Sequence, residues 1–257
     1  SQIEARVLAW LAGQSDLVAA FDAGEDVYKK MAADIYNVAV EDVTKEQRFV
    51  GKTAILGAGY GMGAVRFKEQ LKAQSGVEID INEARRIIDV YRNTNWKIAH
   101  FWRICQNALQ LMYNNKSAAT MGTHGLLVCK GETIRLPSGL DLHYDDLSFE
   151  QGEKGKEFSY KTRQGRTRIY GGKVTENVCQ AIARCIIGDQ MLDIIKKYRA
   201  VMTVHDSIVC VVPEDEVDEA PDMAFGGRRE RVQVILKEAK AELPEEQVPE
   251  LAPEEIT

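Results

Sequence analysis

RFVGKTAILGAGYG, residues 48–61, decides the fold, because charged, apolar and aromatic side chains recur in it at one regular interval. The residues spaced four positions apart are Arg48, Lys52, Leu56 and Tyr60. On a helix this interval predicts one broad, slowly drifting face. Cations on such a face neutralise phosphate oxygens and a flat apolar surface supports a base, so the pattern suits a nucleoside triphosphate. The alternative is an ordinary solvated helix face.

The glycines of the same stretch permit a second interpretation. Gly59, Gly61 and Ala64 fit the G-x-G-x-x-A spacing of a dinucleotide-binding turn. In that interpretation residues 53–56 form the first strand and residues 76–81 the second. A glycine pattern alone is a weak signal, so the rest of the chain has to decide between the two.

Composition sets the class of protein. The chain has 257 residues, of which 45% are apolar, which is enough for one large domain or two small ones. No run approaches the ~20 apolar residues of a membrane span, so we expect no membrane partner. The charged fraction of 28% is too balanced for a disordered chain. Because the chain starts at Ser1 without a leader, we expect a processed product or a cut piece of a longer protein.

The cysteines indicate a reducing compartment. Their number, five, is odd, no two form a C-x-x-C pair, and no histidine lies at zinc-finger spacing. We therefore expect buried, reduced thiols in a cytoplasmic protein.

Charge is divided unevenly along the chain. Residues 213–257 hold 14 Asp and Glu against 5 Lys and Arg, a balance of -9, which leaves +3 for residues 1–212. A weakly basic body with an acidic tail is compatible with nucleic-acid binding.

Periodicity predicts helices first and strands afterwards. The expected helices are 3–11, 17–24, 25–37, 44–56, 64–75, 81–115 and 174–197. From residue 125 the pattern alternates with turn residues, and 201–212 suggests two strands bent around His205 and Asp206. This order predicts an α+β fold rather than a regular βαβ array. Residues 153–173 carry seven Lys and Arg with interleaved aromatics, which suits either contact with nucleic-acid phosphates or a solvated β-ribbon.

Three stretches, in this order, resemble motifs of family A DNA polymerases, the bacterial DNA polymerase I type. SQIEAR at 1–6 resembles the end of the first palm motif, and Arg48-x3-Lys52-x7-Tyr60-Gly61 matches the fingers motif. VHD at 204–206 resembles the core of the last palm motif. RLPSGL and YGGKVTENVCQAIAR lie between them in the expected order, as in phage-type members. The resemblance covers about residues 1–212 and also explains 53–64, which favours it over a dinucleotide enzyme.

The resemblance implies a right-hand polymerase palm with inserted, mostly helical fingers and no thumb. Residues 1–24 are then the first part of the palm and 25–124 the fingers. The rest of the palm, with the basic ribbon and the last catalytic motif, is 125–212, and 213–257 is an acidic tail of uncertain packing.

The resemblance also implies roles for individual residues. Arg48 and Lys52 grip the phosphates of the incoming dNTP and, with Asp206, form the catalytic set. Asp206 is a ligand of the catalytic Mg²⁺ pair. The dNTP site further includes Gln2, Glu4, Leu56 and Tyr60, where Glu4 excludes a ribose 2′-OH. The implied contacts to primer-template DNA are His205 at the primer end, Gln180 in the minor groove, Gly61, Lys161, Arg163, Arg166 and Arg168.

The expected activity is template-directed DNA synthesis, in which dNTP and primer 3′-OH react by a two-metal mechanism. The family's first metal-binding Asp precedes the Ser that stands here at position 1. We therefore expect this chain to be inactive alone and to need an upstream polymerase portion with the thumb, as a fragment or as the product of a splice junction. Leu56 replaces a usual Phe or Tyr, and Ser207 a usual Glu. The rivals are a noncatalytic nucleic-acid-binding fragment and a single-subunit RNA polymerase, which Glu4 argues against.

Overall fold

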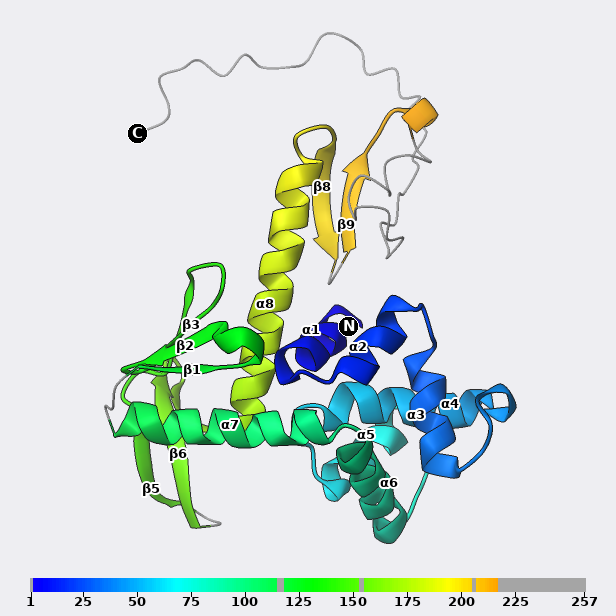
Figure 1. The fold of residues 1–257 in the computed structure, drawn as a ribbon, viewed down its shortest axis with the longest axis horizontal. Helices are drawn as coiled ribbons and strands as arrows, with labels where there is room; N and C mark the ends of the chain where they lie inside the picture. Colours follow the sequence, from blue (N-terminus) through cyan, green and yellow to red (C-terminus); the bar gives the residue numbers. More distant parts are fainter. Residues whose placement is uncertain (1, 115–117, 153–154, 205–206, 217–257) are drawn as a thin grey trace. The chain divides into compact units, whose positions relative to one another are not determined.

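The computed structural model describes residues 2–114, 118–152, 155–204 and 207–216. Helices dominate the first half of the chain and small antiparallel sheets the second, which confirms the predicted α+β class (Figure 1). None of the helices in these ranges is long and apolar enough to cross a membrane. The chain divides into two compact units, Ser1–Asp189 and Gln190–Thr257.

Local capping signals explain where the helices begin and end. The α-helices of the first unit before the sheets are α1 (Gln2–Ala12), α2 (Ser15–Asp22), α3 (Val27–Tyr36), α4 (Lys45–Thr53), α5 (Ala64–Ser75), α6 (Ile81–Thr94) and α7 (Trp96–Tyr113). A short 3₁₀ turn, Val40–Asp42, precedes α4, and a π-helical turn, η2 (Ala54–Ala58), follows it. Thr44 and Gln47 form a capping box at the start of α4. Asn37 and Gly76 end α3 and α5 in the left-handed conformation.

The segment 81–115, predicted to be helical almost throughout, is interrupted at Asn95, which separates α6 from α7. Asn95 has φ -105° and ψ 48°, outside the helical region. Its side-chain Nδ2 donates a 3.3 Å hydrogen bond to the carbonyl oxygen of Tyr91, one turn earlier. A buried Asn that bonds its own helix's backbone competes with the regular helical ladder.

Three antiparallel sheets follow the helices. The first has the order β1 (Ala119–Met121), β2 (Leu127–Lys130), β3 (Thr133–Arg135), β4 (Asp141–His143). The second has the order β5 (Ser148–Gly152), β6 (Gly155–Thr162), β7 (Gly165–Ile169). The second sheet leads into α8 (Gly171–Ile194), and the third sheet is the hairpin β8 (Arg199–Val204) and β9 (Ser207–Val211).

The first unit has two hydrophobic cores. One joins α1, α7, the first two sheets and α8 through residues such as Leu8, Phe101, Leu127, Phe158 and Val178. The other joins α2 to α6. Figure 1 shows α7 extending from the sheets at one end toward α5 and α6 at the other. Because Leu17 and Trp102 pack against both cores, the two halves of this unit are coupled.

In the second unit, the hairpin is followed by a 3₁₀ turn, Glu214–Glu216. Glu216 accepts a 2.8 Å hydrogen bond from the Tyr198 hydroxyl and forms a 2.7 Å ion pair with Lys197. Residues 205 and 206, between the two strands, and the acidic tail from residue 217 lie outside the described residues.

Candidate functional site

The segment Lys45–Gly61 carries the predicted nucleotide site, and it is not one regular helix. α4 ends at Thr53 and η2 at Ala58, where Tyr60 and Gly61 form a turn through a 3.0 Å hydrogen bond from the Gly61 amide to the Ala58 carbonyl. The expectation that four residues share one helical face is therefore wrong for Tyr60. A π turn widens the helix, and such turns are frequent at functional sites.

Arg48 is held in place by the start of α3. Its Nε donates a 2.6 Å hydrogen bond to Asp26 Oδ2, and its guanidinium lies 5.3 Å from the centroid of the Tyr28 ring. Burial opposes ionisation of Asp26, but hydrogen bonds from Arg48 and from two backbone amides outweigh it and lower the pKa of this carboxyl. The helices approach closely at Gly51, where a Cβ would collide with the Tyr28 carbonyl.

Lys52, one turn after Arg48, has an exposed side chain and forms no ion pair within the described ranges. Leu56 on η2 is half-buried. Along one helical segment the structure therefore places Arg48, which pairs with Asp26, then Lys52, which has no ion pair with a described residue, and then the half-buried Leu56. This set can accept an anionic, planar ligand.

The turn at Tyr60 is clamped between α7 and the start of α8. Trp102 Nε1 donates a 2.7 Å hydrogen bond to the Gly59 carbonyl. A Cβ on Gly172 would collide with the Tyr60 carbonyl, so only glycine allows α8 to begin against this turn. Gly61 has φ +81°, a left-handed conformation that favours glycine.

Tyr60 lies near Glu4 of α1. Burial raises the pKa of the Tyr60 hydroxyl, and the neighbouring Cys179, Glu4, Tyr91 and Glu176 raise it further. The structure thus brings together Glu4 and Tyr60, two residues of the predicted dNTP site that lie 56 positions apart in the sequence. Glu4 and Gln2 are both half-buried on α1.

A separate groove of about 480 Å³ contains Gln180. Its walls come from α8, β4 and β6, and its lining residues are Leu142, His143, Tyr144, Tyr160, Asn177, Gln180 and Ala181. Asn177 Nδ2 donates a 3.2 Å hydrogen bond to the Tyr144 hydroxyl. Sequence reasoning did not place His143, Tyr144 or Asn177 in a site. The three-residue spacing of Asn177 and Gln180 on one helix was the available signal.

Three basic residues of the second sheet, Lys161, Arg166 and Arg168, share its outer face. Lys161 pairs with Arg166 in the β6–β7 register, and Ser159 with Arg168, so all four point to one side. The other side carries Phe158 and Ile169, which are buried. The second sheet, β5–β7, is the predicted basic ribbon. It has an apolar face on the core and an outward face that carries Lys161, Arg166 and Arg168.

Two of the four basic residues predicted to contact DNA already form ion pairs within the protein. Arg166 Nη1 lies 2.6 Å from Asp146 Oδ2, and Arg168 Nη2 lies 2.7 Å from Glu157 Oε1. Lys161 and Arg163 form no ion pair within the described ranges, and both are exposed. These two are therefore available to a new anionic partner.

The predicted metal ligand Asp206 and its neighbour His205 lie outside the described residues. Among the residues that are described, no group of three or more His, Cys, Asp or Glu side chains could hold a metal ion.

The dinucleotide alternative is wrong. Its first strand, residues 53–56, lies in the α4–η2 helical segment, and residues 76–80 contain no strand. A dinucleotide-binding turn requires a strand that leads into a helix.

Comparison with known proteins agrees with the resemblance. Residues 1–128 match the model of DNA polymerase family A. The chain is 33% identical over 236 residues to the DNA polymerase of Bacillus phage SP02, in an alignment that covers 85% of this chain and 36% of that one. It is 40% identical over 89 residues to DNA polymerase I of Chloroflexus aurantiacus, covering 35% and 9% of the two chains. This chain thus spans about a third of the phage relative and less of the bacterial one.

A solved structure shares the fold. The POL domain of Pol1 from M. smegmatis, in a complex with DNA primer-template and dNTP, matches with a TM-score of 0.55 and 20% identity, over 88% of this chain and 35% of that chain. The family model, the phage relative and the fold agree, and this chain belongs to DNA polymerase family A.

Proposed function

We propose that this chain supplies the nucleotide-binding and part of the DNA-binding surface of a DNA-directed DNA polymerase, which transfers a nucleotidyl group from a dNTP to a primer 3′-OH. The observation that carries the proposal is the segment Lys45–Gly61. It presents Arg48, Lys52 and Leu56 on one helical segment and ends at Tyr60, beside Glu4.

Each residue of this segment has a task in the proposed reaction. Lys52, which is exposed, binds the triphosphate, and Arg48 adds a second positive charge from a position fixed by Asp26. Leu56 supports the sugar and base by apolar contact. Glu4 excludes a ribose 2′-OH, and Tyr60 lies at the end of the site, near the templating base.

DNA contacts the remaining surfaces in this proposal. The groove with Gln180 and Asn177 receives the minor-groove edge of the primer-template duplex, because both side chains offer hydrogen-bond donors and acceptors. Lys161, Arg163, Arg166 and Arg168 on the outer ribbon follow backbone phosphates. The proposed division is into helical fingers, 25–124, and palm, 1–24 and 125–212, although α7 packs in one core with α1, the first two sheets and α8.

Mg²⁺ is the proposed cofactor, with Asp206 as a ligand. When bound, a divalent ion activates the attacking oxygen and stabilises the leaving pyrophosphate. The described residues provide no metal cage, so the cofactor proposal rests on the family resemblance of Asp206.

Nucleotide binding tests the proposal directly. Fluorescently labelled primer-template is bound to the chain, and the affinity for the complementary dNTP is measured through the change in anisotropy. We expect Lys52→Ala to weaken dNTP binding about 10- to 100-fold, the loss of a charge-assisted contact of ~1.5–3 kcal/mol. The matched control is Lys45→Ala, an exposed lysine at the start of the same helix. Equal effects of the two variants, or no dependence on the templating base, would contradict the proposal.

Primer extension tests the chemistry. It is measured with the chain alone and with a chimera in which the chain replaces the matching segment of the SP02 polymerase. Incorporation that is lost in Asp206→Ala and retained in Asp189→Ala supports the proposed role of Asp206. DNA binding without incorporation in both proteins favours a noncatalytic nucleic-acid-binding function.

A further inference from the structure

The groove that contains Gln180 has an asparagine amide that a buried tyrosine holds. Tyr144, directly after β4, is 1% exposed, and its hydroxyl accepts a 3.2 Å hydrogen bond from Nδ2 of Asn177 on α8. The ring of Tyr160 on β6 packs edge-on against the Tyr144 ring, with the centroids 5.2 Å apart and an interplanar angle of 74°. Burial and this ring contact fix the hydroxyl that orients the amide.

The bond to Tyr144 decides which atom Asn177 offers to the groove. Asn177 is half-buried, and its Oδ1 accepts no hydrogen bond from the described part of the chain. The oxygen and the nitrogen are two branches of one planar amide, so a nitrogen turned toward Tyr144 turns the oxygen away from it. Because Asn177 lines the groove of about 480 Å³, this acceptor is open to a ligand there.

Gln180, three residues further along α8, is arranged in the same way. Its Nε2 lies 3.5 Å from Oε1 of Glu176, which in turn forms a 2.9 Å ion pair with Lys173. Within the described ranges, Gln180 Oε1 accepts no hydrogen bond. Both amides therefore turn a nitrogen toward the protein and keep a carbonyl oxygen free.

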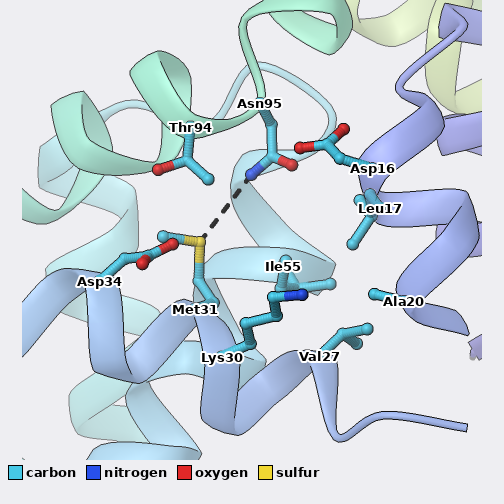
Figure 2. Close-up of a pocket in the computed structure, with 10 residues that line it drawn as sticks. All are labelled: Asp16, Leu17, Ala20, Val27, Lys30, Met31, Asp34, Ile55, Thr94 and Asn95. Carbon is cyan, nitrogen blue, oxygen red and sulfur yellow. Dashed lines mark hydrogen bonds between the residues drawn. The ribbon is translucent and has the colours of Figure 1, made fainter. Parts of the chain in front are cut away.

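Asn95 shows what a purely structural asparagine looks like in this chain. It lines a cavity of about 60 Å³ between α2, α3, η2 and the α6–α7 junction (Figure 2). Asn95 is 2% exposed, and its Nδ2 donates to the Tyr91 carbonyl of its own segment. The cavity is smaller than the one of about 150 Å³ that holds benzene in an engineered protein, so no edge of a base pair enters it. The Asn177 amide, in contrast, lies in an open groove.

A free acceptor distinguishes base pairs in the minor groove of DNA. Every base pair presents acceptors there, at purine N3 and pyrimidine O2, and a pair with guanine adds one donor, the 2-amino group. A carbonyl oxygen accepts a hydrogen bond from that amino group and has no donor to meet on an A·T pair.

We propose that Asn177 Oδ1 reads the 2-amino group of guanine in the primer-template duplex and that Tyr144 is the positioning residue that sets the amide in this orientation. The inference rests on the proposed function, which places the minor groove of the duplex at this groove, and it names the chemical group recognised there. Without the Tyr144 hydroxyl the amide turns freely and also presents Nδ2, which donates to the acceptors that every base pair carries. The contact then no longer depends on guanine.

Duplexes that differ by one amino group test the inference. One base pair of an otherwise A·T primer-template is made G·C or inosine·C and is moved through the positions next to the primer end, and fluorescence anisotropy measures each affinity. Inosine pairs with cytosine and lacks the 2-amino group. At one position we expect the inosine duplex to bind about 3- to 10-fold more weakly, the loss of one neutral hydrogen bond. There, 2,6-diaminopurine·T, which adds the amino group to an A·T pair, should bind more tightly than A·T by a similar factor.

Three variants assign the effect to individual side chains. Tyr144→Phe removes the hydroxyl and keeps the ring, so the ratio of the G·C to the inosine·C affinity should fall to one. Asn177→Ala should have the same result. Tyr160→Phe is the matched control, because the Tyr160 hydroxyl lines the same groove and forms no hydrogen bond within the described ranges, and it should keep the full ratio. A ratio of two affinities does not depend on the fraction of folded protein, so a loss of stability leaves this readout unchanged.

The outcomes separate this inference from the proposed function. Equal affinity for the G·C and inosine·C duplexes at every position, or a ratio that Tyr144→Phe leaves intact, would overturn the inference and leave the proposed function in place. A wild-type chain that binds no primer-template would overturn both.

Discussion

Trp102 Nε1 donates a 2.7 Å hydrogen bond to the carbonyl oxygen of Gly59, and this contact fixes the end of the proposed nucleotide-binding segment. Gly59 follows the π turn, where the last helical carbonyls have no partner in the helix itself. The indole supplies that partner from the middle of α7, 43 positions further along the chain. Because Trp102 packs against both cores, the turn before Tyr60 is held by the part of the unit where the two cores meet.

Trp102→Phe should lower the free energy of unfolding by about 1–3 kcal/mol, because it leaves the Gly59 carbonyl without its donor and keeps most of the apolar contact. Urea denaturation measures this loss. The matched control is Trp96→Phe at the start of the same helix, where the side chain is 58% exposed and little change is expected. Equal losses in the two variants would show that the hydrogen bond to Gly59 contributes nothing.

Gly172→Ala should destabilise the protein by about 1–3 kcal/mol, since the added methyl group collides with the Tyr60 carbonyl and forces the turn away from α8. Gly188→Ala is the control in the same helix, because a Cβ there meets nothing within 4 Å. It should stabilise α8 by up to about 1 kcal/mol through helix propensity. Thermal unfolding of the two variants should therefore shift in opposite directions.

Helix boundaries were the most predictable part of the fold, because their signals are local. Thr44 with Gln47, Asn37 and Gly76 act within one turn of their own helix, and each ends or begins a helix where expected. The break at Asn95 depends on burial against α3 and could not be read from residues 81–115.

The site was predictable in composition and not in geometry. Spacing singled out Arg48 and Lys52 as candidates, but it could not show that Asp26 pairs with Arg48 while Lys52 forms no ion pair with any described residue. The turn at Tyr60 packs closely against Gly172 of α8, which lies more than 100 positions away in the sequence. Residues of the Gln180 groove come from three separate elements, so no single stretch of sequence displayed them together.

Asp26→Asn tests how the ion pair with Arg48 depends on pH. Asn caps a helix about as well as Asp, so the substitution removes the charge and leaves the start of α3 capped. Because the pKa of folded Asp26 lies below its unfolded value of about 3.9, the pair contributes stability that is complete above about pH 5. That contribution is lost as the pH falls through the folded pKa.

The stability difference between wild type and Asp26→Asn should therefore be largest at neutral pH and shrink as the pH falls through the lowered folded pKa of Asp26. Urea unfolding midpoints across this range measure it. Asp42→Asn, on an exposed 3₁₀ turn, is the control and should show a smaller change. A difference that is independent of pH would mean that Asp26 acts as a cap and not as a charge.

Thiol alkylation should distinguish the cysteines. Burial raises the pKa of Cys105 to about 12 and that of Cys179 well above its usual value, so neither forms a thiolate in the folded protein. Cys185 is half-buried and should react first with iodoacetamide at pH 8. Peptide mass spectrometry checks the order. Early modification of Cys105 would contradict the buried core around α7 and α8.

The final prediction concerns the basic residues of the second sheet. It distinguishes Lys161 and Arg163, which have no ion pair with a described residue, from the paired Arg166. Lys161→Ala and Arg163→Ala should each weaken binding to primer-template and reduce the slope of log K against log salt by about 1, because each removes one phosphate contact. Arg166→Ala also breaks the contacts to Asp146 and Ser148, so it should lower the unfolding midpoint of the protein as well. Fluorescence anisotropy at several salt concentrations and thermal unfolding measure the two effects. Equal salt slopes for wild type, Lys161→Ala and Arg163→Ala would remove the ribbon from the DNA-binding surface.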